Sequence, residues 1–98
     1  MRVVFVAGAL ADLAELEEVL SLPGDTRIRV RESVRTLERF PYAGRALKGE
    51  WEPYRLWMGP WPWMLFVYEV LESRELVAVV TVRDARSSSS PTMPRSRP

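Results

Sequence analysis

The first half of the chain changes from strand spacing to helical spacing of its apolar residues. Val3 to Val6 is a β-branched and aromatic run that Gly8 ends, which predicts a buried strand. From Leu10 to Leu20, apolar residues recur every three or four positions while acidic side chains fill the other positions. This pattern predicts an amphipathic helix that packs its apolar face against the strand.

A second helix is expected after a short turn. The turn is Pro23-Gly24-Asp25, and Asp25 or Thr26 has the side chain of a helix N-cap. The residues just after it alternate as in a strand, but Val30, Val34 and Leu37 restore helical spacing. The two predicted helices therefore form a hairpin.

The second half of the chain reads as strands separated by turns. Gly59-Pro60 and Glu72-Ser73-Arg74 interrupt a region rich in aromatic and β-branched residues. The expected strands are Pro53–Met58, Trp63–Leu71 and Glu75–Arg83, in an antiparallel meander of three or four strands. The order of elements predicts an α+β protein with an N-terminal strand, a helical hairpin and a β-meander.

The chain has the length of one small domain. Its 98 residues leave space for a single hydrophobic core, which we expect to lie within residues 1–86. Residues 87–98 contain five Ser, three Pro and two Arg, too polar and Pro-interrupted to pack. We therefore expect a flexible basic tail there.

Composition excludes several kinds of site. The sequence has no Cys and no His, which removes disulfides, zinc-finger spacings and every catalytic triad that uses imidazole as base. A metal site would need carboxylates alone, so we expect neither metal nor cofactor. No apolar run approaches the roughly 18 residues of a membrane span, and the lack of Cys fits the cytoplasm. Asn and Gln are also missing, which suggests a thermophilic source.

Charge is segregated along the chain although the net charge is only +1. Residues 26–55 carry eight basic and four acidic side chains, and residues 83–98 carry four basic and one acidic. Such clustering creates a local surface that attracts anions. A solvated helix face explains the arginines of the second helix equally well.

The ordered features of the chain resemble the RelE/ParE superfamily of toxins. The pattern is a leucine-bearing helix end, Pro and Gly, Leu-Lys-Gly, an Arg-bearing strand, a glycine turn, Val-Tyr-Glu-Val, and a Val-rich strand ending in basic residues. The residues that carry it are Leu37, Phe40 to Gly49, Trp51, Tyr54 to Leu56, Gly59, Val67 to Val70 and Val77 to Arg83. The resemblance implies a two-layer RelE-like sandwich and the toxin of a type II toxin–antitoxin system.

The resemblance also implies a set of catalytic positions. Arg55 stands where nuclease members have a basic strand residue, and Lys48 matches the basic residue of the preceding loop. Arg83 and Arg86 match the basic residues after the last strand. Cutting RNA through its 2′-hydroxyl requires a base, positive charge on the phosphate and an acid, which such side chains supply on a concave sheet.

Two departures from the nuclease pattern weigh against catalysis. Leu65 occupies the position of an arginine, and residues 87–98 have no counterpart of the C-terminal Tyr or His. Arginine stays protonated at ordinary pH and is a poor base. Glu50 or Glu52 would have to serve instead, although solvated loop acids are the simpler interpretation.

Four tryptophans lie within thirteen residues, at positions 51, 57, 61 and 63. Trp and Arg dominate binding hot spots and stack on bases, so Trp57, Trp61, Trp63 and Arg45 are candidate binding residues. Tryptophans at alternate strand positions also fill cores. We expect about half to be buried, with Trp61 and Trp63 the most exposed.

These features lead to two functional hypotheses. The first is a toxin that inhibits translation by ribosome-dependent mRNA cleavage and that a cognate antitoxin silences. The alternative is a non-enzymatic binder with the same fold, either an inhibitor of DNA gyrase or a toxin that has lost activity. An exposed aromatic turn and an open sheet edge suit an antitoxin, or equally a homodimer.

Overall fold

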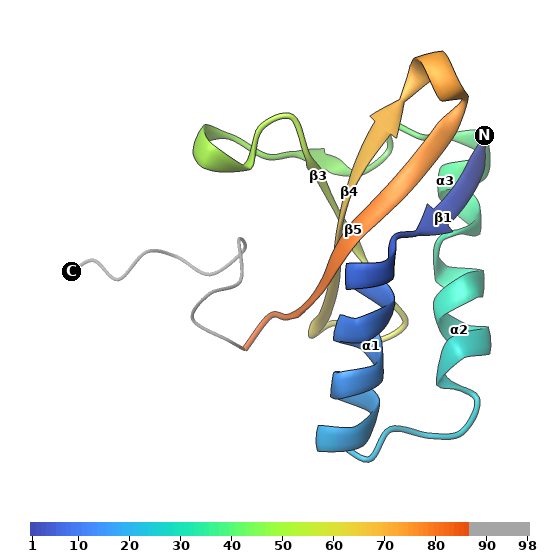
Figure 1. The fold of residues 1–98 in the computed structure, drawn as a ribbon, viewed down its shortest axis with the longest axis vertical. Coiled ribbons are helices and arrows are strands. Elements are labelled where there is room, and N and C mark those ends of the chain that lie inside the picture. Colours follow the sequence, from blue (N-terminus) through green and yellow to red (C-terminus); the bar gives the residue numbers. More distant parts are fainter. Residues whose placement is uncertain (87–98) are drawn as a thin grey trace.

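A five-stranded mixed sheet carries the helices on one face (Figure 1). The computed structural model describes residues 1–86, so the expected tail 87–98 lies outside the described residues. The strands are β1 (Arg2–Phe5), β2 (Arg45–Ala46), β3 (Arg55–Met58), β4 (Met64–Leu71) and β5 (Leu76–Asp84), in the order β1-β5-β4-β3-β2. Within residues 1–86 only β1 pairs in parallel, with β5. The expected α+β fold is therefore confirmed.

The helical hairpin follows β1 directly. Its first arm is α1 (Ala7–Val19), and its second consists of α2 (Thr26–Ser33) and α3 (Arg35–Arg39), separated at the buried Val34. The indole N–H of Trp57 donates to the Ser33 carbonyl at 2.7 Å, at the end of α2. The second helix is thus interrupted where the sequence predicted one continuous helix.

The expected cap of α2 is wrong in its mechanism. Asp25 occupies the N-cap position, but its side chain makes no capping hydrogen bond. Its carboxylate instead pairs with Arg29 one turn later, at 2.9 Å. The Thr26 hydroxyl donates to the Pro23 carbonyl at 2.6 Å and stabilises the turn rather than the helix end.

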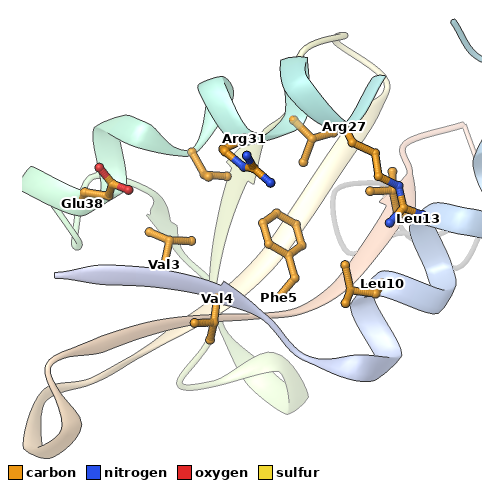
Figure 2. A pocket seen from close by; sticks show the side chains of 10 residues that line it. Val3, Val4, Phe5, Leu10, Leu13, Arg27, Arg31 and Glu38 are labelled. Atoms are coloured by element: carbon orange, nitrogen blue, oxygen red, sulfur yellow. The ribbon is translucent and has the colours of Figure 1, made fainter. Parts of the chain in front are cut away.

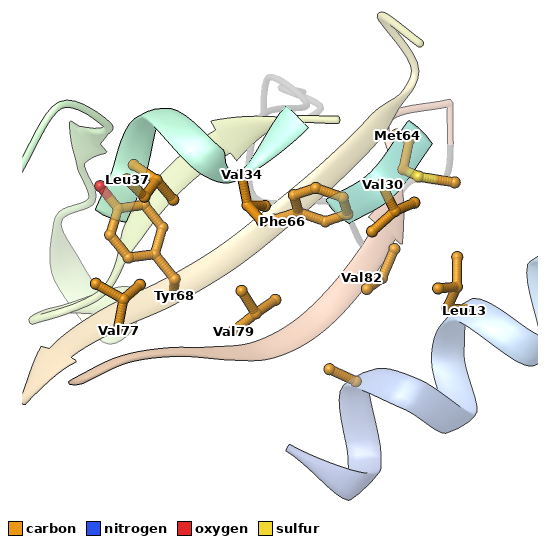
Figure 3. Packing of buried hydrophobic residues seen from close by; sticks show 11 residues of the cluster. Leu13, Val30, Val34, Leu37, Met64, Phe66, Tyr68, Val77, Val79 and Val82 are labelled. Atoms are coloured by element: carbon orange, nitrogen blue, oxygen red, sulfur yellow. The ribbon is translucent and has the colours of Figure 1, made fainter. Parts of the chain in front are cut away.

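The core fills the space between the hairpin and the sheet. Apolar spacing in the helices and strand alternation in β4 and β5 direct side chains toward each other. Figure 3 shows this packing for Leu13, Val30, Val34, Leu37, Met64, Phe66, Tyr68, Val77, Val79 and Val82. The face that these strand residues occupy is the helix side of the sheet. The other face is called the helix-free face below.

A bulge in β5 decides which of its residues lie on each face. Val67 pairs with Thr81 while the next residue, Tyr68, pairs with Val79, so Val80 is an extra residue without a partner. Such an insertion reverses the alternation of side chains beyond it. Val82 consequently belongs to the core, and Thr81 and Arg83 lie on the helix-free face.

Candidate functional site

The helix-free face combines an apolar floor with two arginines. Arg45 pairs with Leu56 across β2 and β3, and Arg83 pairs with Leu65 across β5 and β4. Directly opposite residues point to the same face, so both arginines accompany apolar neighbours. A hollow of about 450 Å³ lies there, lined by Arg45, Leu56, Met58, Pro62, Leu65 and Ala85.

The segment between β2 and β3 contributes an aromatic residue to this face. It contains a short 3-10 turn, Gly49–Trp51, and the guanidinium of Arg83 lies 5.8 Å from the ring centre of Trp51. Lys48 and Glu50 are exposed on the same segment, and Glu52 follows it. Trp51 is one of the four clustered tryptophans but was not among the predicted binding residues, and the structure places it beside Arg83.

Arg55 is not part of this face, because it pairs with the core residue Tyr68 and therefore lies on the helix side. Its guanidinium donates to the carbonyl oxygens of Tyr42 at 3.1 Å and Gly44 at 2.6 Å, and it lies 5.1 Å from the Tyr42 ring. The expectation that Arg55 and Arg83 share one surface is wrong. Arg55 instead stabilises the loop that follows α3.

Arg86 is likewise separated from Arg83. Alternation beyond Val82 places Asp84 on the helix side, and Arg86 forms an ion pair with that carboxylate at 2.8 Å. The hydrogen bond from Arg86 lowers the pKa of Asp84 below its ordinary value. Arg86 also lies 4.8 Å from the ring centre of Trp63. Of the four predicted catalytic residues, only Arg83 lies on the helix-free face and only Lys48 on the segment beside it.

The three predicted binding tryptophans pack inward. Trp57, Trp61 and Trp63 are all partly buried and contact the core. Trp61 and Trp63 stack with ring centres 5.8 Å apart and an angle of 6° between the rings, and Arg29 of α2 lies 5.9 Å from Trp61. All four tryptophans are partly buried, so the predicted split between buried and exposed tryptophans is wrong. The rings of Trp61 and Trp63 cover each other, and Arg29 and Arg86 flank them.

A second hollow lies beside the outer edge of β1. It has a volume of about 430 Å³, and its wall includes residues from both faces of that strand, Val3 and Val4. Figure 2 shows Arg31 of α2 above Phe5, and Arg27 beside Leu13. Among residues 1–86, β1 pairs only with β5, so its other edge is open to a further strand.

The part of the chain that the structure describes contains neither a metal-binding cluster nor a membrane-spanning helix. Over residues 1–86 no three acidic side chains gather as a metal site would require. No helix in that range has the length and apolar character needed to cross a bilayer.

The fold of the chain is RelE-like, and three solved structures share it. One such solved structure is the RelBE2 toxin–antitoxin complex of Mycobacterium tuberculosis; a chain of it is 21% identical, with a TM-score of 0.67, over 85% of this chain and 95% of that one. A copper-bound mutant toxin from Helicobacter pylori is 20% identical, with a TM-score of 0.63, over 86% and 93%.

A conserved hypothetical protein of Helicobacter pylori is 21% identical, with a TM-score of 0.53, over 86% and 93%. No protein-family profile and no curated protein matches the sequence. At these identities the likeness establishes the fold.

Proposed function

We propose that this chain is the toxin of a toxin–antitoxin pair and that it blocks its target by binding through the helix-free face. The observation that carries the proposal is the pairing of Arg83 with Leu65 and of Arg45 with Leu56. Two cations beside a partly buried apolar floor suit a macromolecular surface that is itself part anionic and part apolar.

Binding fits this face better than cleavage of RNA. Leu65, where nuclease members place an arginine, is 4% exposed, and Arg55 and Arg86 lie on the helix side. An arginine supplies positive charge but does not take a proton from a 2′-hydroxyl at neutral pH. By the ParE-like branch of the resemblance, the target of such a binder is DNA gyrase.

Ribosome-dependent cleavage of mRNA remains the second candidate function. The contact between Trp51 and Arg83 brings the segment that carries Lys48 and Glu50 to the face. Trp51 would then stack on a nucleobase of the RNA while Arg83 contacts a phosphate. Glu50 would act as the general base that takes the proton of the 2′-hydroxyl.

The proposed partner is a cognate antitoxin that binds at the outer edge of β1. An added strand would satisfy the open edge, and its apolar side chains would enter the hollow shown in Figure 2. Arg27 and Arg31 line that hollow, so the antitoxin segment is expected to carry carboxylates. The Arg27 guanidinium already forms an ion pair with Glu17 at 2.9 Å, which leaves Arg31 as the better-placed contact.

Induced expression followed by two in vitro assays tests the proposal. Expression should stop growth, and Arg83→Ala and Arg45→Ala should each relieve the arrest. Arg74→Ala is the matched control, because Arg74 is exposed on the turn at the far end of β4 and β5. Purified protein should leave translated mRNA intact in a cell-free system and should inhibit gyrase supercoiling. Specific mRNA cuts that disappear in Glu50→Gln would favour the second candidate, and normal growth on expression would overturn the toxin proposal.

A further inference from the structure

Arg83 is connected to α1 through a chain of hydrogen bonds. Its Nε–H donates to the hydroxyl oxygen of Thr81 at 3.1 Å, and that hydroxyl donates to Oδ2 of Asp12 at 2.6 Å. The same carboxylate oxygen accepts the backbone N–H of Val82 at 3.1 Å. Asp12 lies on α1, 69 residues before Thr81 in sequence.

The strand geometry explains why Asp12 reaches this position. Pairing of β1 with β5 ends at Phe5 and Val79, and the chain then turns into α1 beside the remainder of β5. The N–H of Val82 therefore has no neighbouring strand, and a carboxylate from α1 takes that place. Because of the bulge at Val80, Thr81 and Arg83 lie together on the helix-free face.

We propose that Asp12 and Thr81 are positioning residues, which set the direction in which the Arg83 guanidinium faces the target. The proposal rests on the proposed function of the helix-free face. A hydroxyl has one hydrogen to donate and lone pairs to accept with. Since Thr81 gives its hydrogen to Asp12, its lone pair is directed to the Nε–H of Arg83. The long arginine side chain then loses part of its rotamer freedom before it binds.

Thr81→Val distinguishes the positioning of Arg83 from a purely structural role of Asp12. Valine keeps the shape and branching of threonine and removes both side-chain bonds, while the bond from Val82 to Asp12 stays. Thr81→Ser retains the hydroxyl and should restore the wild-type behaviour. Thr36→Val is the control, since Thr36 is exposed on α3 and its hydroxyl makes no hydrogen bond among residues 1–86.

The first measurement does not depend on any target. The Nε–H signal of Arg83, assigned by NMR with Arg83→Lys, should exchange with solvent about tenfold faster in Thr81→Val. Thr81→Ser and Thr36→Val should retain the slow exchange. An unchanged Arg83 signal in Thr81→Val would overturn the proposal.

The second measurement is the concentration of the toxin that inhibits its target by half. Thr81→Val should weaken inhibition about tenfold, and adding it to Arg83→Ala should cause no further loss. Equal losses in both backgrounds would show that Thr81 acts independently of Arg83, which overturns the proposal. If Arg83→Ala inhibits as strongly as wild type, the proposed function of the helix-free face is wrong. The exchange rate of the Arg83 Nε–H still tests whether Thr81 positions Arg83.

Discussion

The backbone N–H of Gly44 donates a hydrogen bond to the Tyr68 hydroxyl at 2.9 Å. The same hydroxyl donates to the carbonyl of Pro41 at 2.8 Å, so Tyr68 joins the loop after α3 to the middle of β4. The approach is so close that a Cβ at position 44 would lie 2.5 Å from the carbonyl oxygen of Leu56 and 2.6 Å from the Tyr68 hydroxyl. A glycine is required here because of space.

Gly44→Ala should therefore lower the free energy of unfolding by about 1–3 kcal/mol, the usual cost of overpacking. Chemical denaturation monitored by circular dichroism measures the change. Gly8→Ala is the control: a Cβ at Gly8 of α1 meets nothing within 4 Å, and alanine favours the helix. A fully stable Gly44→Ala variant would contradict the contact.

Tyr68→Phe should also destabilise the protein, because it leaves the N–H of Gly44 and the carbonyl of Pro41 without their partner. Loss of a buried hydroxyl that serves two groups costs about 1–3 kcal/mol. Equilibrium unfolding in urea provides the measurement. Tyr54→Phe is a suitable comparison, since Tyr54 is partly exposed and its hydroxyl forms no hydrogen bond within residues 1–86. Equal stability of the two variants would contradict this prediction.

Stability should fall at alkaline pH. Burial raises the pKa of Tyr68 above its ordinary value of 10.0. A hydrogen bond to the Glu72 carboxylate raises the pKa of Tyr42 in the same direction. The folded state therefore keeps these protons longer than the unfolded state, so the stabilisation is complete below pH 10 and decreases as the pH rises through the folded pKa. Unfolding free energies measured from pH 8 to 12 should decline more steeply in wild type than in Tyr68→Phe.

Arg55→Ala should lose stability even though Arg55 is partly exposed. Its two hydrogen bonds to backbone carbonyls make the loss about 1–2 kcal/mol. Arg45→Ala is the matched control, because Arg45 is exposed and changes at such positions stay within about 0.5 kcal/mol. Melting temperatures of the two variants give the comparison. A larger loss of stability in Arg45→Ala than in Arg55→Ala would contradict this prediction.

The stacked rings of Trp61 and Trp63 should give an exciton couplet in the far-ultraviolet circular dichroism spectrum. The separation of 5.8 Å between the ring centres couples the two indole transitions. Trp61→Leu and Trp63→Leu should each abolish the couplet, and Trp51→Leu should leave it in place. A couplet that survives both single substitutions would show that the rings do not stack in solution.

Local patterns in the sequence predicted most of the fold. The three meander strands begin and end within two residues of their predicted limits, because turn residues and strand alternation mark them. β2 was not predicted as a separate strand. It has only two residues, Arg45 and Ala46, and pairing with β3 rather than its own composition defines it.

The site was harder to predict because it depends on which face each residue occupies. Alternation counted from Val77 assigns Thr81 and Arg83 to the core, and only the bulge at Val80 corrects this. The side of Arg55 follows from its pairing with Tyr68, which no local pattern shows. The hydrogen bond between Thr81 and Asp12 joins distant parts of the chain, so no pattern within either segment predicts it.

The extra residue at Val80 also affects how this chain should be aligned with other sequences. An ungapped alignment that matches Val77 and Val79 to the core positions of a regular strand compares Arg83 with a core position and Val82 with a position on the helix-free face. Such an alignment scores the end of β5 as a mismatch even where the folds agree. A one-residue gap after Val79 restores the match, so relatives whose last strand is regular should be sought with that gap allowed.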